Sequence, residues 1–250
     1  MDKEQRIGIT EISDPAFHLD IFDRLYKGNI IITKNLTPAL INKLVENKDK
    51  CILHCTCTGM GGSKIEPLVP KMTWTFLQVK KLITDGFPVD HIVLRIDPIV
   101  PTEKGIETAL SVLNLFKPLG IKRIRISFLD MYNHVKERFN ENNIPIPYDT
   151  FHADDLTRWE AYGAINNFCV ENDLELEMCG EPPIGTDGSI KTVGCLSQKD
   201  IDILGLTDEI VLEGKKDGRK ECQCPANKFE LIKDKPKQCH NGCLYCYLKN

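Results

Sequence analysis

The sequence predicts an α/β protein that folds as a partial or complete (β/α) TIM-like barrel and continues into a cysteine-rich tail. Short β-branched runs alternate with amphipathic segments up to about residue 212, which predicts parallel strands joined by helices. About seven such units favour one barrel over residues 1–213, and a doubly wound open sheet is the competing arrangement. From Gly214 onward the chain is polar and rich in lysine, so residues 214–250 form a separate tail.

The predicted strands are short runs rich in Val, Ile and Thr that end at polar or turn-forming residues. In chain order they are Arg6–Glu11, Asn29–Thr33, Cys51–Thr58, His91–Asp97, Lys122–Phe128, Leu174–Cys179 and Glu209–Leu212. Polar and apolar residues alternate within several of these runs. This alternation predicts that one face of the sheet packs on helices while the other faces the barrel interior.

The predicted helices are marked by caps and by apolar stripes. Asp14-Pro15 and Thr37-Pro38 each place a capping oxygen before a proline at the first helical position, so we expect a helix to begin at each. Apolar residues at helical spacing predict further helices over 72–85, over 105–117 and after the loop Asn140–Tyr148.

The composition is that of a soluble globular protein, with 42% hydrophobic and 27% charged residues among 250. No apolar run approaches the roughly 18 residues of a membrane span, and MDKEQRIGIT lacks the pattern of a secretion signal, so we expect a cytoplasmic protein without membrane partners. The net charge of −4 supplies no general attraction to nucleic acid. Because cytosolic disulfides are disfavoured, the 11 cysteines indicate metal binding, catalysis or burial.

Three of these cysteines, Cys239, Cys243 and Cys246, form a CX3CX2C motif in the tail. The tail cannot bury enough apolar surface to order itself, and a bound metal would supply that order. Three thiolates on one tight loop can hold three corners of a 4Fe–4S cluster and leave one iron open. A structural zinc site that combines two of them with Cys222 and Cys224 is the alternative.

The CX3CX2C spacing, with Tyr245 before the third cysteine, resembles the cluster motif of radical S-adenosylmethionine enzymes, and CHNGCLYCY is closest to the form in spore photoproduct lyase-like proteins. In such enzymes the open iron binds S-adenosyl-L-methionine, whose reductive cleavage yields a 5′-deoxyadenosyl radical. The resemblance implies Tyr245 beside the cofactor, a reductase or a flavodoxin- or ferredoxin-type electron donor, and a nucleic-acid or nucleotide substrate. Those enzymes usually carry the motif after their first strand, whereas here it occupies residues 239–246.

Five further segments carry a second resemblance: ITKNLTP (32–38), LRIDPIV (94–100), ISFLDMY (126–132), CGE (179–181) and GCL (194–196). They resemble motifs of a bacterial family known as domain of unknown function 1848, in which we expect the cysteine motif at the C-terminal end. The segment EISDPAFH (11–18) follows the family pattern SRRTDIPAF only loosely, because it lacks both arginines. The family name carries no reaction, so this resemblance bears on architecture more than on function.

Four cysteines are surplus to a three-thiolate cluster: Cys179, Cys195, Cys222 and Cys224. Two of them, Cys179 and Cys195, lie at positions that match the family motifs. Our hypothesis is that the four bind a second 4Fe–4S cluster or a zinc ion, and free buried thiols are the alternative. The cysteines that we interpret as core residues are Cys51, Cys55, Cys57 and Cys169.

Polar residues on the inner face of the predicted strands mark a site, because parallel barrels place their chemistry at the carboxyl ends of the strands. By alternation Arg95 and Asp97 share one face of their strand, and Ser127 points inward from the next. The resemblance to radical enzymes implies a cation for the S-adenosylmethionine carboxylate, for which Lys34 and Arg95 are the candidates. It also implies a polar group for the ribose, for which Asp97 and Ser127 are the candidates. A structural ion-pair network of Arg95, Asp97 and Asp130 is the alternative.

Two further segments are candidates for catalysis or binding. Cys179-Gly180-Glu181 stands at a strand end, as the Gly-Gly-Glu motif of radical enzymes does, which makes Glu181 a candidate catalytic residue. A glycine-rich loop after the third strand would let its backbone approach a phosphate, a nucleotide or a methionine tail, and a flexible loop without ligand is the alternative. Its candidate cofactor-binding residues are Gly59, Gly61 and Gly62. We interpret His54 as a strand residue and expect His240 to shape the cluster loop rather than to bind metal.

The leading hypothesis is a radical S-adenosylmethionine-type enzyme on a partial barrel, with the cluster loop of the tail folded back over the barrel mouth. A non-catalytic zinc or iron–sulfur protein, in which the metal only fixes the tail to the barrel, is the first rival. An iron–sulfur protein used for electron transfer or redox sensing is the second.

Overall fold

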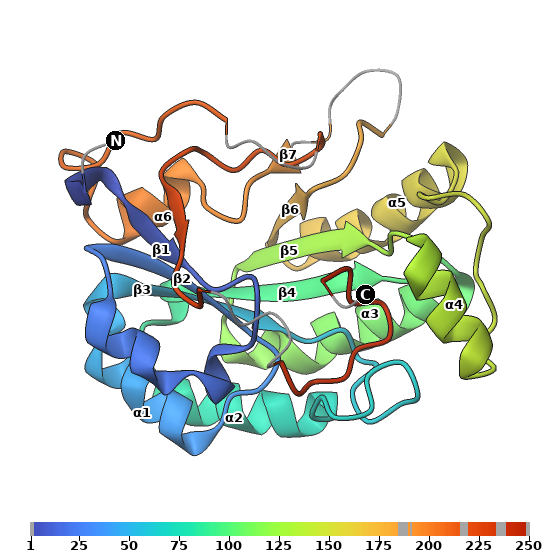
Figure 1. Ribbon diagram of the computed structural model, residues 1–250, viewed down its shortest axis with the longest axis horizontal. Helices are drawn as coiled ribbons and strands as arrows, with labels where there is room; N and C mark the ends of the chain where they lie inside the picture. The colour runs from blue at the N-terminus through green and yellow to red at the C-terminus, as the bar shows by residue number, and fades with distance from the viewer. Residues whose placement is uncertain (1–2, 185–189, 191, 216–219, 234–238, 249–250) are drawn as a thin grey trace.

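The computed structural model describes residues 3–184, 190, 192–215, 220–233 and 239–248. Eight parallel strands form one sheet in the order β7-β6-β5-β4-β3-β2-β1-β8 (Figure 1). They are β1 (Ile7–Ile9), β2 (Gly28–Thr33), β3 (Cys51–Thr56), β4 (Ile92–Ile99), β5 (Arg123–Phe128), β6 (Glu175–Cys179), β7 (Thr192–Val193) and β8 (Lys228–Glu230). Within the described ranges no pairing joins β7 to β8, so the (β/α) barrel is partial and open at that seam.

Helices cover the two faces of the sheet unequally. The α-helices are α1 (Pro38–Glu46), α2 (Met72–Thr84), α3 (Glu103–Phe116), α4 (Asn133–Glu141), α5 (Asp155–Glu171) and α6 (Gln198–Ile203). Helices α1, α2, α3 and α5 share one apolar cluster with the strands, and we call the face they cover the outer face. On the opposite, inner face, Ile201 of α6 packs with Ile7, Ile9 and Ile30 in a second apolar cluster. None of the described helices combines the length and the apolar character needed to cross a membrane.

The two predicted caps have different outcomes. The Thr37 hydroxyl accepts a hydrogen bond from the first turn of α1 at 3.2 Å, and Pro38 occupies the first helical position, as expected. The Asp14 carboxylate also caps the backbone that follows it, at 3.0 Å. That backbone forms only two 3-10 helices, Pro15–Phe17 and Leu19–Arg24, rather than an α-helix.

The three helices predicted from apolar stripes are confirmed as α2, α3 and α5. In α5 only part of the apolar stripe faces the core, because Leu156 and Trp159 are 66% and 44% exposed while Ile165 is buried. Helix α4 was not predicted, since only Val135 and Phe139 of its nine residues are buried and its sequence has little apolar signal.

Alternation along the central strands divides apolar from polar residues as predicted. Ile92, Leu94 and Ile96 of β4 belong to the outer-face cluster, so Arg95 and Asp97 project to the inner face. The cysteines interpreted as core residues are likewise buried, namely Cys51, Cys55, Cys57 and Cys169. The alternation in β4 thus places charged side chains on the inner face of the sheet.

The strand predicted over Glu209–Leu212 is wrong, because this segment is an irregular stretch on the inner side of the molecule. Its backbone groups are satisfied by side chains instead of by a strand. Val211 N donates to Gln5 Oε1 at 3.0 Å, and the amide of Asn227 donates to the Val211 carbonyl at 3.0 Å. Ile210 is buried, which explains the apolar signal that suggested a strand.

The last strand of the sheet comes from the tail. β8 pairs in parallel with β1, so that Ile7 lies opposite Lys228 and Ile9 opposite Glu230. The pairing places the orange-red strand β8 beside the blue strand β1 in Figure 1. The tail is thus anchored by backbone hydrogen bonds before it reaches its last cysteines. The division into residues 1–213 and 214–250 remains a prediction.

Candidate functional site

A row of charged side chains lines the inner face near the carboxyl ends of β4 and β5. Arg95 Nε donates to Asp97 Oδ2 at 2.6 Å, and the Ser127 hydroxyl donates to the other oxygen of the same carboxylate. Burial alone would raise the pKa of Asp97, but the guanidinium of Arg95, the hydroxyl of Ser127 and the ammonium of Lys34 hold it below its ordinary value. Asp97 is therefore ionised and fixed in position at neutral pH.

The ion pair of the alternative interpretation is therefore present between Arg95 and Asp97. Its third predicted member, Asp130, pairs with His152 at 2.9 Å. The ion pair does not bury the Asp97 carboxylate completely, since 23% of the surface of this side chain is exposed. A ligand in front of the strand ends can reach it.

Lys34 connects this row to the tail. Its Nζ donates to Glu66 Oε1 at 3.1 Å and to the carbonyl of Asp97 at 3.1 Å. The Glu66 side chain is completely buried, and it also accepts from the hydroxyls of Thr58, at 2.6 Å, and of Tyr245. The Lys34 ammonium lies 5.4 Å from the centre of the Tyr245 ring. A buried lysine–glutamate pair thus holds the tyrosine of the cysteine motif against the barrel.

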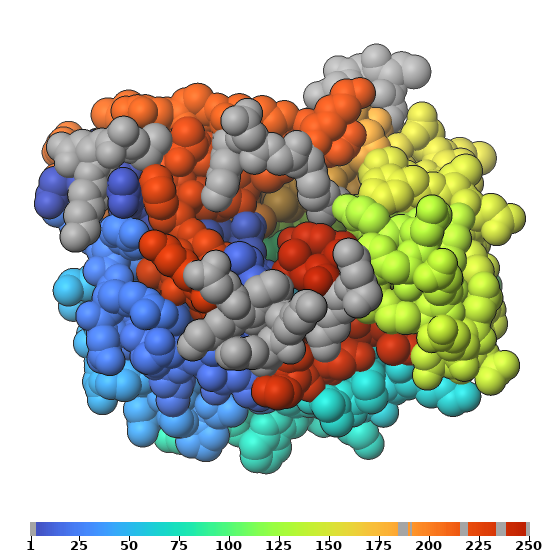
Figure 2. Space-filling view, in the orientation of Figure 1, coloured from blue at the N-terminus to red at the C-terminus, as the bar shows by residue number. Residues whose placement is uncertain are grey.

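The loop of Cys239, Cys243 and Cys246, hereafter the C-terminal motif, is fixed by backbone contacts. Leu244 N donates to the Ile65 carbonyl at 2.9 Å, and Cys246 N donates to the Cys243 carbonyl at 3.2 Å. Cys243 is buried, whereas Cys239 and Cys246 are half-buried. In Figure 2 the red atoms of this segment lie at the surface, between the blue N-terminal part and the yellow-green α4.

Asn241 and Gly242 shape the loop of the C-terminal motif. Gly242 has φ = +69°, and a Cβ there would lie 3.3 Å from Pro67, so the loop bends closely over the barrel at this residue. The Asn241 amide donates to Asp14 Oδ2 at 2.8 Å, while its buried Oδ1 has no hydrogen-bond partner in the described part of the chain. The His240 ring packs against Phe17 with ring centres 5.1 Å apart, as expected for a residue that shapes the loop.

The C-terminal motif fits the cluster that its spacing implies. Burial raises the pKa of the Cys243 thiol to about 11, although the Lys34 ammonium and the Tyr245 hydroxyl favour its thiolate. A bound metal deprotonates such a thiol, and the adjacent ammonium then offsets its charge.

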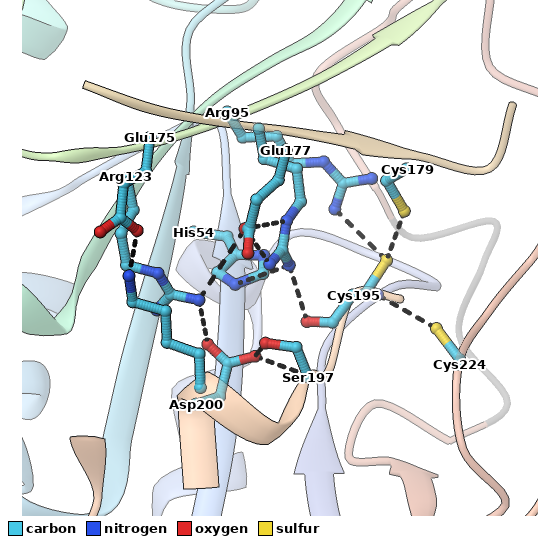
Figure 3. A network of polar contacts seen from close by, with 12 residues as sticks. His54, Arg95, Arg123, Glu175, Glu177, Cys179, Cys195, Ser197, Asp200 and Cys224 are labelled. Atoms are coloured by element: carbon cyan, nitrogen blue, oxygen red, sulfur yellow. Dashed lines mark hydrogen bonds and ion pairs between the residues drawn. The ribbon is translucent and has the colours of Figure 1, made fainter. Parts of the chain in front are cut away.

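The four surplus cysteines, hereafter the four-thiol group, converge on the inner face from three parts of the chain. Figure 3 shows three of them, Cys179, Cys195 and Cys224. Cys179 ends β6 and Cys195 follows β7, and their sulfurs are 3.6 Å apart. Cys195 N donates to Cys224 Sγ at 3.2 Å, and Cys224 N donates to Cys222 Sγ at 3.5 Å. The sequence hypothesis grouped these four, and the fold brings them together.

Charged groups surround the four-thiol group. Arg95 Nη1 lies 3.8 Å from Cys195 Sγ, so one guanidinium touches both Asp97 and a thiol. A carboxylate oxygen of Glu11 lies within 4.8 Å of the sulfurs of Cys195 and Cys224. Glu11 in turn accepts from Lys228 Nζ at 2.7 Å. Neither Glu11 nor Lys228 was singled out from the sequence, because nothing in their neighbourhood along the chain marks them.

An arginine network lies beside the four-thiol group, and Figure 3 labels two of its members, Arg95 and Arg123. The completely buried Arg125 donates to Glu177 at 2.5 Å and to the carbonyl of Cys195 at 3.2 Å. Its Nη1 also lies 3.4 Å from His54 Nε2. Burial, together with the neighbouring arginines, holds the pKa of His54 well below its ordinary value. His54 is therefore a neutral strand residue, as predicted.

Glu181 stands just beyond the end of β6 as a buried carboxyl group. Its Oε1 accepts from Phe128 N at 2.7 Å, and its Oε2 lies 3.6 Å from the guanidinium of Arg158. Burial, with repulsion from Asp130 and Asp97, raises the pKa of Glu181 to about 8. A carboxyl group that titrates near neutrality beside the strand ends can hold or release a proton there, as a catalytic residue would.

The predicted glycine-rich loop borders a cavity of about 470 Å³. Gly59 lines this cavity together with Pro98, Ile99, Phe139 and Ile144. The other two glycines have packing reasons for their identity. A Cβ on Gly61 would lie 1.9 Å from the Pro70 carbonyl oxygen, and Gly62 has φ = +77°. Cofactor binding by this loop remains a prediction.

The residue that sequence reasoning missed at the C-terminal motif is Glu66, the buried partner of Lys34. Its segment SKIEPLVPK is a loop without periodicity, so no local pattern marks Glu66 as buried. Arg138 of α4 was missed as well, and it donates to the Cys246 carbonyl at 2.5 Å. Both contacts depend on segments far apart in the sequence.

Comparison with known proteins places the chain in a family. A search of curated proteins and a search of solved structures each give no match. The family described as Domain of unknown function (DUF1848) matches residues 21–248. This match covers most of the chain and agrees with the resemblance seen in the five sequence motifs. The chain therefore belongs to the DUF1848 family.

Proposed function

We propose that this protein is a radical S-adenosylmethionine-type enzyme whose C-terminal motif holds a 4Fe–4S cluster. The observation that carries the proposal is the placement of Tyr245, between Cys243 and Cys246, against the Lys34–Glu66 pair. Lys34 follows β2 and donates to the carbonyl of Asp97 in β4, so the motif lies at the carboxyl ends of these strands. Three thiols on one loop would face the part of a parallel barrel where ligands bind. The motif therefore meets the barrel mouth although it follows the strands in the sequence.

Such a cluster, when bound, supplies an open iron and the electron for reductive cleavage of S-adenosylmethionine. The chain's own residues would bind and orient that cofactor. Lys34 is the better candidate for its carboxylate, because its ammonium uses two of its three N–H donors, on Glu66 and on the Asp97 carbonyl, and keeps the third for a ligand. The Lys34 and Asp97 side chains keep 17% and 23% of their surface exposed, so one ligand can contact the ammonium and the carboxylate together.

The adjacent cavity suits an apolar part of a bound molecule. Its volume of about 470 Å³ lies within the range of ligand pockets, and more than half of its lining residues have apolar side chains, mainly prolines and branched aliphatic residues. Lys104 is the one charged residue among those that line it. A methionine tail or a nucleobase fits this lining better than a phosphate backbone does, so a nucleotide is the first substrate class to test.

The rival function is that of a non-catalytic metal-binding or electron-transfer protein. The four-thiol group favours it, because thiols gathered on the inner face can bind metal without any substrate. The two functions differ in one measurable outcome, the fate of S-adenosylmethionine.

Anaerobic purification tests the proposal first. We expect a brown protein with about four irons in the C-terminal motif and absorbance near about 400 nm. Dithionite and S-adenosylmethionine should then release 5′-deoxyadenosine. The Cys243→Ala variant should lose this activity, whereas Cys169→Ala, which removes a buried thiol in α5, should retain it.

Two outcomes would overturn the proposal. A colourless protein that contains zinc but no iron would assign the C-terminal motif to a structural role. An intact cluster that releases no 5′-deoxyadenosine would assign the protein to electron transfer or redox sensing.

A further inference from the structure

The four-thiol group is brought together by an unusually close approach of two backbone segments. A Cβ on Gly194 would lie 2.8 Å from Cys224 Cα and 2.9 Å from Cys224 N. Only glycine therefore permits Cys195 N to reach Cys224 Sγ at 3.2 Å. The contact joins the end of the edge strand β7 to the segment that leads into β8.

The distances between the sulfurs distinguish a site for a single metal ion from a site for a 4Fe–4S cluster. Two sulfurs bound to one zinc at about 2.3 Å lie at most about 4.6 Å apart, and about 3.8 Å apart at a tetrahedral angle. The Cys179 and Cys195 sulfurs are 3.6 Å apart, and the sulfurs of Cys195 and Cys224 lie within 4.8 Å of each other. In a 4Fe–4S cluster each cysteine binds a different iron, whereas two sulfurs 3.6 Å apart are spaced to share one metal ion.

The surroundings compensate the charge that four thiolates and one divalent ion would carry. Arg95 lies 3.8 Å from Cys195 Sγ, and the buried Lys228 ammonium is close enough to the thiols of Cys195 and Cys224 for its charge to interact with them. The backbone N–H groups of Cys195 and Cys224 donate to sulfur, as donors in the outer shell of thiolate metal sites do. Cations and donors around several sulfurs are what a bound metal requires.

We propose that Cys179, Cys195, Cys222 and Cys224 bind one zinc ion, in a second metal site that is independent of the C-terminal motif. Binding replaces the thiol protons with four zinc–sulfur bonds and involves no change of oxidation state. Cys222 is the fourth ligand rather than Glu11, because Lys228 already holds the Glu11 carboxylate. The ion would fasten residues 222–224 to the ends of β6 and β7.

The decisive experiment removes the other metal site from the full chain. The triple variant Cys239→Ala, Cys243→Ala, Cys246→Ala should retain about one zinc and almost no iron per chain, measured by plasma mass spectrometry after anaerobic purification. Adding Cys195→Ala should remove that zinc, whereas adding Cys169→Ala should not. Cobalt(II) in place of zinc should give the ligand-field spectrum of a tetrahedral thiolate site.

Three results would overturn the inference. Retention of about four irons in the triple variant would assign a second cluster to the four-thiol group. Absence of any metal would leave the thiols free. Loss of zinc in Glu11→Gln, with retention in Cys222→Ser, would make Glu11 the fourth ligand.

A measurement on the wild-type protein covers the case in which the triple variant does not fold. Zinc-edge X-ray absorption should show four sulfur neighbours at about 2.3 Å. Nitrogen or oxygen neighbours would contradict the assignment. Neither zinc measurement depends on S-adenosylmethionine cleavage, so failure of the proposed function and failure of this inference are distinguishable.

Discussion

The two sets of thiols differ in how the chain assembles them. The C-terminal motif lies on one loop and is recognisable from its spacing alone, whereas the four-thiol group draws on the end of β6, the end of β7 and the segment before β8. A buried ion pair and one tyrosine hold the first set, while backbone groups that contact sulfur directly hold the second. A motif can be read locally, but a site assembled from distant segments depends on the topology.

The largest expected effect separates the two sets by their metals. Cys243→Ala should abolish iron binding and 5′-deoxyadenosine formation but leave zinc in place. Cys195→Ala should abolish zinc binding but leave iron in place. Since structural zinc in small domains binds with apparent free energies of about 10–16 kcal/mol, Cys195→Ala should also lower Tm by about 10 °C or more. Metal analysis and thermal unfolding test both variants, and loss of both metals in either one would show that the sites are not independent.

The next effect concerns the ion pair that holds the C-terminal motif. Lys34→Met leaves the Glu66 carboxylate buried without its cation, and such a change costs about 3–5 kcal/mol. Urea unfolding should show this loss and its partial recovery in the double variant Lys34→Met, Glu66→Gln. The control is Lys43→Met, which breaks an exposed pair with Glu46 and should cost about 1 kcal/mol or less. Equal losses for Lys34→Met and Lys43→Met would contradict this role of the buried pair.

A smaller effect tests the close approach at the four-thiol group. Gly194→Ala forces the backbone around Cys224 to move, which should cost about 1–3 kcal/mol and weaken zinc binding without affecting iron. The matched control is Gly163→Ala in α5, where a Cβ meets nothing within 4 Å. Because alanine favours a helix, this control should be neutral or stabilising by up to about 1 kcal/mol. Chemical unfolding and metal titration measure both, and unchanged zinc affinity in Gly194→Ala would rule out the strain.

The smallest effect is a pH dependence of the folding stability that arises from His54, in the arginine network beside the four-thiol group. The folded pKa of His54 is lowered, so the unfolded chain binds a proton first as the pH falls through the ordinary value of 6.5. The stability that neutral His54 provides is therefore complete above 6.5 and decreases below it, by at most about 1.4 kcal/mol per pH unit. Urea unfolding at pH 7.5 and 5.5 should show a smaller decrease for His54→Gln than for the wild type. An identical pH dependence would exclude His54 as its source.

The central fold was predictable because its signals are local. Strands β2 to β6 are each longer than four residues and carry apolar residues either in runs or in alternation with polar ones, and caps such as Thr37 mark where helices begin. β7 and β8 were missed because strands of two or three residues in a polar stretch of sequence show no periodicity. β8 is a strand because it forms backbone hydrogen bonds with β1, which lies more than 200 residues earlier in the chain. The site residues show the same dependence on local signals. Alternation within its strand predicted that Arg95 faces the site, whereas the loop that contains Glu66 has no pattern that predicts its burial.

The pairing of β1 with β8 also governs the order in which the molecule can be completed during translation. Ile7–Ile9 leaves the ribosome about 220 residues before Lys228–Glu230. Until then, β1 exposes an unpaired edge on which another strand could add, and slow closure of such distant contacts prolongs that state. The nascent chain is therefore expected to need chaperone protection until synthesis passes residue 230, and the proposed zinc ion could bind all four thiols only after Cys224 has been synthesised.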